Sequence, residues 1–109
     1  MIKVLHNKNF LKFAICFDEK SLLEKAAKIK MSDLTEVARV DTDNLDEAFR
    51  LTNHIDSDWS TNEKVATIAK SRSTSVGDIL QFNGQFWIVA NLGFVKIQAK
   101  SMKNNMTTK

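Results

Sequence analysis

The side chains best suited to binding chemistry lie in one polar run, residues 71–75 (SRSTS), which precedes Val76, Gly77 and Asp78. Hydroxyl groups and the guanidinium of Arg72 are groups that can hold a phosphate. However, a P-loop needs a glycine-rich turn and a lysine that open a helix, and this run precedes a predicted strand. The alternative is that the hydroxyls and Asp78 lock a turn through local side-chain to backbone hydrogen bonds, and we favour it.

A polar loop cluster beside an aromatic side chain also suits a binding surface, and six residues form this candidate site. They are Trp59, Arg72, Ser73, Thr74, Ser75 and Asp78. For each residue taken singly, a structural turn packed by Trp59 is the favoured interpretation. Replacing Arg72 with alanine separates the two roles, because lost binding with unchanged melting indicates function and lost melting alone indicates structure.

The other chemistry-bearing side chains form no catalytic or metal-binding pattern. His6 and His54 lack zinc-ligand spacing, and the sequence holds a single cysteine. Asp56 and Asp58 lack the glycine and the terminal glutamate of an EF-hand, so turn formation is favoured. Cys16 lies between apolar residues on an expected strand and should be buried and inert. We therefore expect no enzyme activity, no metal and no cofactor.

The charge of the chain is unevenly distributed. The net charge is +3, yet residues 31–63 contain nine acidic and two basic residues, a net of −7, and the remainder carries +10. If these segments form separate faces, the acidic face suits a basic partner and the basic face suits nucleic acid or an acidic protein surface. The alternative is a mixed, solvated surface.

The length and the apolar content of the chain limit the classes of protein to which it can belong. The 109 residues suffice for one domain with a core, and the single Cys16 agrees with a reducing compartment. No apolar run approaches the roughly 20 residues of a membrane span, and the N-terminus lacks the apolar core of a signal peptide. We expect a cytoplasmic protein that does not cross a membrane.

The firmest structural prediction is a β-hairpin at residues 79–89, whose strands flank Asn83-Gly84, a pair typical of a type I′ turn. Near the N-terminus, residues 2–5 and 10–17 predict two short strands joined by a polar turn. Helical spacing predicts helices over residues 21–31 and 45–54, with Asp18 or Ser21 as N-cap of the first. The remaining predicted elements are a strand at residues 34–40, a turn or strand at 65–69 and a last strand near 94–97.

This order of elements predicts a small α+β domain at residues 1–97, in which an antiparallel or mixed sheet of about five strands is covered by two helices. Residues 98–109 lose apolar density and should form a basic, flexible tail. A nucleic-acid-binding module is the alternative function. It would use the basic termini and the hairpin aromatics Phe82, Phe86 and Trp87, although aromatic pairs across a hairpin more often fill a core.

A longer constellation resembles small, mostly uncharacterised proteins encoded in phage genomes. Its features are a helix ending in Thr-Asn, a Trp a few residues later, an Arg-Ser-Thr-Ser-Val-Gly-Asp turn and a Gly-Phe after the last hairpin. The matching residues are Thr52, Asn53, Trp59, Arg72, Ser73, Thr74, Ser75, Val76, Gly77, Asp78, Gly93 and Phe94. The resemblance spans residues 45–97, and this chain has Trp87 where such relatives often have tyrosine.

The resemblance implies a phage early protein that binds and redirects a host component or blocks a defence system in the infected cell. It carries over no catalytic residue. The implied partner is a host protein, and nucleic acid is the alternative partner. Asymmetric charge without a reactive constellation agrees with occupying a surface rather than turning over a substrate.

Overall fold

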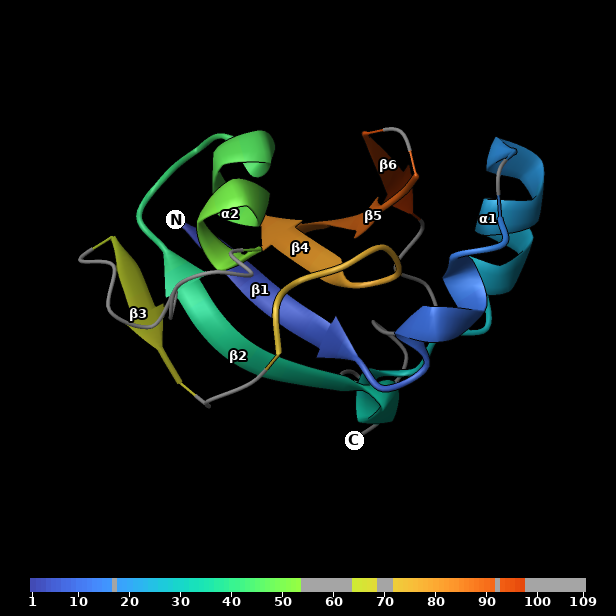
Figure 1. The fold of residues 1–109 in the computed structure, drawn as a ribbon, viewed down its shortest axis with the longest axis horizontal. Helices are drawn as coiled ribbons and strands as arrows, with labels where there is room; N and C mark the ends of the chain where they lie inside the picture. Colours follow the sequence, from blue (N-terminus) through green and yellow to red (C-terminus); the bar gives the residue numbers. More distant parts are fainter. Residues whose placement is uncertain (17, 54–63, 69–71, 92, 98–109) are drawn as a thin grey trace.

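A six-stranded antiparallel sheet forms the framework of the protein, seen here in a computed structural model (Figure 1). The structure describes residues 1–16, 18–53, 64–68, 72–91 and 93–97. The strands, in sheet order, are β3 (Val65–Thr67), β2 (Leu34–Val40), β1 (Ile2–Asn7), β4 (Ile79–Phe82), β5 (Gln85–Val89) and β6 (Phe94–Ile97). Together with the helices α1 (Glu19–Ala26) and α2 (Leu45–Thr52), they confirm the predicted α+β class.

The first strand of the chain lies in the middle of this sheet. β1 pairs with β2 on one side and with β4, more than 70 residues further along the chain, on the other. Five of its six residues are buried, which is typical of a strand covered on both faces. β2 carries one extra residue, Val37, opposite the step from Val4 to Leu5, and this β-bulge changes the register at that point.

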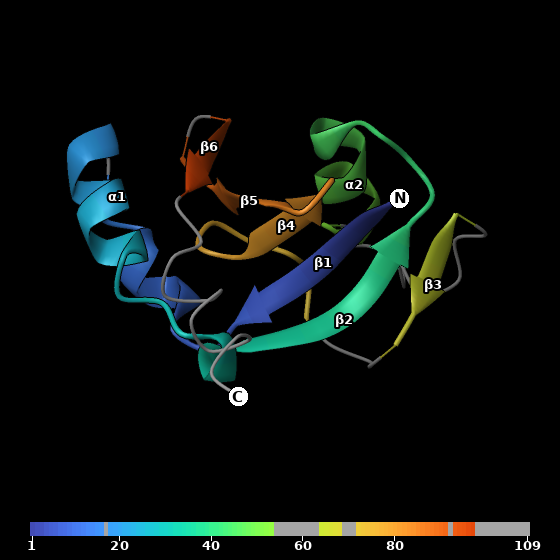
Figure 2. The ribbon, with the colours of Figure 1, turned by 180° about the vertical axis from the view of Figure 1, so that it is seen from behind.

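Each face of the sheet has its own hydrophobic core because neighbouring strand residues point to opposite faces. Ile79 packs in a cluster with Leu22 and Ile97, on the side of α1, whereas the adjacent Leu80 packs in a cluster with Ala48, on the side of α2. The two views from front and back place α1 beyond β6 at one end of the molecule, with β3 at the other end (Figures 1 and 2). The sheet thus lies between two hydrophobic cores, and each core has one of the two helices on its side.

The hairpin between β4 and β5 confirms the prediction from Asn83-Gly84. Both residues have positive φ angles, 54° and 74°, as a type I′ turn requires. Phe86 is buried in the core on the α1 side, while Phe82 and Trp87 are half-buried. The packing interpretation of these aromatics is therefore confirmed for Phe86.

The prediction of a second strand at residues 10–17 is wrong. The chain forms a short 3-10 helix there, η1 (Phe10–Phe13), and β1 takes its partners from β2 and β4 instead. The physical reason is the spacing of the aromatics: residues three apart lie on the same side of a 3-10 helix, so Phe10 and Phe13 can both face inward. Cys16 is buried as expected, but it follows this turn and does not lie on a strand.

The helix ends follow local capping chemistry. Asp18 accepts a hydrogen bond from Ser21 N and caps α1, so the first of the two proposed caps is the one used. α1 ends at Ala26, five residues before the predicted end, and a second 3-10 helix, η2 (Met31–Asp33), leads into β2. Asn44 caps α2 by accepting from Glu47 N.

Several predictions concern residues outside the described part of the chain. These are the C-terminal tail at 98–109, the place of Trp59 beside the polar turn, and the turn at Asp56 and Asp58. The last predicted strand is present as β6, and residues 65–67 form the short edge strand β3.

Candidate functional site

The candidate site is built around a buried carboxylate, Asp78, which lies immediately before β4 and has no exposed surface. Its Oδ1 accepts hydrogen bonds from Asn7 N at 2.8 Å and from Arg72 Nη2 at 2.8 Å. Its Oδ2 accepts from Ser75 N at 2.8 Å and from Arg72 Nη1 at 2.7 Å. The pair is bidentate, and two backbone donors complete the coordination of the carboxylate, which is the condition for burying a charge.

Arg72 connects this carboxylate to the N-terminal part of the chain. Its Nη2 also donates to Asn7 O at 3.2 Å and its Nη1 to Ser73 O at 3.0 Å. The guanidinium carbon lies 3.5 Å from the centre of the Phe10 ring, a cation–π contact. Arg72 therefore holds the 72–78 turn, the end of β1 and the start of η1 together.

Gly77 allows the turn and η1 to approach each other closely. Its φ angle is +97°, and a Cβ atom at this position would lie 2.5 Å from Phe10 O. Asn7 Nδ2 donates to Gly77 O at 3.1 Å, and Gly77 N donates to Val89 O at 2.9 Å. Only glycine fits both the backbone angle and the space.

His6 extends the network on the α2 side of the sheet. Its Nε2 lies 3.0 Å from Thr74 Oγ1 and 3.9 Å from Asp78 Oδ2. Burial lowers the pKa of His6 below its ordinary value; the charge of Asp78 raises that pKa, and the charge of Arg72 lowers it. Burial thus favours the neutral imidazole at neutral pH, and Arg72 supplies the countercharge of Asp78.

The structure brings five of the six candidate binding residues into one network. Arg72, Thr74, Ser75 and Asp78 contact one another or share partners, and Ser73 contributes its carbonyl oxygen to Arg72. Trp59 lies outside the described residues. The bond from Ser75 N to Asp78 is the local side-chain to backbone bond of the turn interpretation, and direct binding by these residues stays a prediction.

Three members of the network were not predicted from sequence. His6, Asn7 and Phe10 join the turn across about 70 residues of chain, and no spacing rule connects positions so far apart. The residue pattern of the N-terminal segment predicts only an apolar strand followed by a polar turn. Only the pairing of β1 with β4 places these residues beside Asp78.

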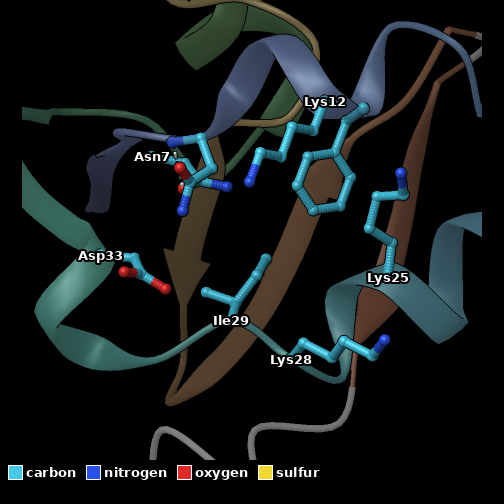
Figure 3. A pocket seen from close by; sticks show the side chains of 8 residues that line it. Asn7, Lys12, Lys25, Lys28, Ile29 and Asp33 are labelled. Atoms are coloured by element: carbon cyan, nitrogen blue, oxygen red, sulfur yellow. Dashed lines mark hydrogen bonds between the residues drawn. The ribbon is translucent and has the colours of Figure 1, made fainter.

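A second feature is a cavity of about 320 Å³ on the other side of Asn7 (Figure 3). We call it the lysine pocket, and its lining residues come from β1, η1, α1 and the segments that follow them. They are Asn7, Asn9, Lys12, Phe13, Lys25, Lys28, Ile29 and Asp33. The sequence alone does not predict this pocket, although Lys25 and Lys28 lie three residues apart, a spacing that puts two side chains on one side of a helical turn.

Comparison with protein-family models, with curated proteins and with solved structures finds no match to this chain. Within the described residues, no three His, Cys, Asp or Glu side chains gather as a metal site would require. None of the helices in that part of the chain is long and apolar enough to cross a membrane.

Proposed function

We propose that this protein is a small phage-type binding protein without catalytic activity that docks on a host protein in the cytoplasm of the infected cell. The observation that carries the proposal is a pair of exposed aliphatic side chains, one within η1 and one two residues after it. Leu11 is 72% exposed and Ile15 is 71% exposed, whereas the aliphatic residues of both sheet faces are mostly buried. We call this pair the Leu11/Ile15 patch.

Burying such side chains against a partner is favourable by about 1.5–3 kcal/mol each, which is a large share of a typical binding energy. Single exposed apolar residues are common on protein surfaces and need no explanation. Leu11 and Ile15 lie within five residues of chain, on a segment that the contact of Phe10 with Arg72 holds in place before a partner binds.

Basic side chains next to the patch indicate the chemistry of the partner. Ile15 lines a hollow together with Lys25, Lys28 and the acidic Glu24, so two of its three charged side chains are cationic. A partner with an apolar depression and an acidic rim would complement both the aliphatic and the cationic groups. This complementarity favours a host protein over a nucleic acid, whose backbone offers no apolar depression.

The network around Asp78 supports a binding role rather than catalysis. Four hydrogen bonds occupy the carboxylate oxygens, and Arg72 uses its terminal nitrogens on Asp78, Asn7 and Ser73. Groups engaged in this way hold a structure in place. Through Phe10, they fix the segment that carries the Leu11/Ile15 patch.

The test is an affinity capture from lysate of the native host at physiological salt, with and without nuclease. Three variants are compared with the wild type: Leu11→Asp, Ile15→Asp and, as a matched control, Ile68→Asp. Ile68 is also an exposed aliphatic residue, but it follows β3 at the opposite end of the sheet from α1 (Figure 1).

We expect one discrete protein to be captured by the wild type and by Ile68→Asp in both conditions. Its affinity for the purified chain should fall about 30-fold or more with Leu11→Asp or Ile15→Asp, the effect of losing a hot-spot side chain. Equal capture by all four chains would contradict the proposal. Capture that nuclease abolishes would favour the alternative, a nucleic-acid module that uses the basic termini.

A further inference from the structure

The lysine pocket has a polar side, a basic side and an apolar floor. In Figure 3, Asn7 and Asp33 lie on one side, Lys25 and Lys28 on the other, and Lys12 reaches in between from η1. Phe13 and Ile29, both buried residues of the α1-side core, contribute the apolar surface. The pocket therefore presents three cations around a partly apolar hollow.

The lining of this pocket is positively charged on balance, with three lysines and one carboxylate, although Glu24 lines the adjoining hollow with Lys25 and Lys28. None of the ion pairs within the described part of the chain engages Lys12, Lys25 or Lys28. The one acidic group of the lining, Asp33, is engaged elsewhere, because its Oδ1 lies 3.5 Å from Lys8 Nζ and its Oδ2 accepts from Lys30 N at 3.1 Å. Three free ammonium groups that line one cavity favour an anion.

The volume of the pocket and its apolar lining indicate which kind of anion fits. A volume of about 320 Å³ suits a small organic ligand and exceeds the need of a bare inorganic ion. Phe13 and Ile29 offer contact area to a ring, and the side-chain amide of Asn9 offers a donor and an acceptor to its edge. A ligand that matches all three features carries a phosphate at one end and a planar heterocycle at the other.

We propose that the lysine pocket binds a mononucleotide-sized organic phosphate. The phosphate contacts Lys12, Lys25 and Lys28, and the heterocycle lies over Phe13 and Ile29. The pocket adjoins the Leu11/Ile15 patch, because Lys25 and Lys28 also line the hollow beside Ile15, but phosphate binding does not require the proposed host partner. Asn7 is common to the pocket and to the Asp78 network, so ligand binding would also hold the end of β1.

The experiment is isothermal titration calorimetry of the purified full chain with three probes: adenosine 5′-monophosphate, adenosine and inorganic phosphate. Two substitutions are compared with the wild type. Lys12→Gln removes one of the three cations, and Lys3→Gln is the matched control, because Lys3 is exposed on β1 and does not line the pocket. Urea unfolding of each variant checks that the fold is kept.

We expect the monophosphate to bind at least about tenfold more tightly than adenosine or phosphate, because only the monophosphate uses both the cations and the apolar floor. Lys12→Gln should weaken its binding about tenfold, the effect of losing one charge-assisted hydrogen bond, and Lys3→Gln should leave it unchanged. Added salt should weaken the wild-type binding.

Three results would overturn the assignment. The first is no binding of the monophosphate, and the second is an equal loss in Lys3→Gln and Lys12→Gln. The third is binding of inorganic phosphate as tight as that of the monophosphate, which would mean an anion hole and not a site for an organic phosphate. Leu11→Ala adds no charge beside Lys12 and lies outside the pocket lining, so it should weaken docking on the host protein but bind the monophosphate normally; failure of the docking proposal and failure of this one are therefore distinguishable.

Discussion

We expect the substitution Asp78→Asn to destabilise the protein strongly although it changes neither shape nor volume. Each oxygen of Asp78 accepts from one backbone N–H and one guanidinium nitrogen. Whichever way the asparagine amide is turned, its NH2 group faces two donors and can satisfy neither. The guanidinium of Arg72 loses its countercharge at the same time.

The magnitude follows from the burial of the site. Leaving buried donors without an acceptor costs about 1–3 kcal/mol each, and breaking a buried ion pair costs about 3–5 kcal/mol. Asp78 has no exposed surface, so we expect a loss of about 3–5 kcal/mol in the free energy of unfolding. Arg72→Ala should cost less, about 2 kcal/mol, because the Arg72 side chain is 32% exposed and water can reach the vacated space.

The assay is equilibrium unfolding in urea, followed by circular dichroism at neutral pH. Glu36→Gln is the control, because the Glu36–Arg39 pair is an ion pair of 2.6 Å that is open to solvent, and its loss should cost at most about 1 kcal/mol. If Asp78→Asn shifts the free energy of unfolding no more than Glu36→Gln does, the network does not stabilise the fold and the reasoning is refuted.

Two further predictions concern the same turn. Gly77→Ala should lower the free energy of unfolding in urea by about 2 kcal/mol more than Gly84→Ala does. Both positions have a positive φ, but only a Cβ atom at position 77 would lie 2.5 Å from Phe10 O. Equal losses would contradict the close approach. For His6, whose folded-state pKa lies below the ordinary 6.5, the unfolded chain takes up the proton first as pH falls. As the pH is lowered from 6.5, the free energy of unfolding should therefore decrease by up to about 1.4 kcal/mol per pH unit until the folded-state pKa is passed. His6→Gln should flatten this pH dependence. An identical slope in both proteins would show that His6 is not its cause.

The parts of the fold that sequence predicts well are those set by neighbouring residues. The type I′ turn at Asn83-Gly84 fixes the hairpin of β4 and β5, and residues 34–40 alternate well enough to give β2 its bounds. α2 begins at Leu45 as predicted, because capping residues precede a regular apolar spacing. Each of these signals lies within a window of about ten residues.

The segment at residues 10–17 shows the limit of such local signals. Aromatic and aliphatic residues there favour a strand by propensity, but β1 already has two neighbours, so no free edge remains for a third partner. The segment instead turns as η1 and buries Phe13, while Leu11 stays exposed. Tertiary pairing overrides propensity at this position.

The candidate site also depends on tertiary pairing, so the sequence predicts only its local part. The link from Arg72 and Ser75 to Asp78 spans only a few residues and could be expected from the turn itself. His6, Asn7 and the lysine pocket depend on which strands pair and where η1 lies. The sequence contains these residues, but their proximity is a property of the sheet order.

The central place of β1 has a consequence for biosynthesis. β1 can pair with β2 as soon as residue 40 has left the ribosome, whereas β4, its other neighbour, is synthesised about 40 residues later. Until then one edge of β1 is open, and His6 and Asn7 lack Thr74 and Asp78 as partners. Pairings of high contact order form slowly, and exposed apolar strand edges aggregate. A chain that stops before residue 72 should therefore need a chaperone or be degraded, and the native sheet is completed only when β4 and β5 emerge.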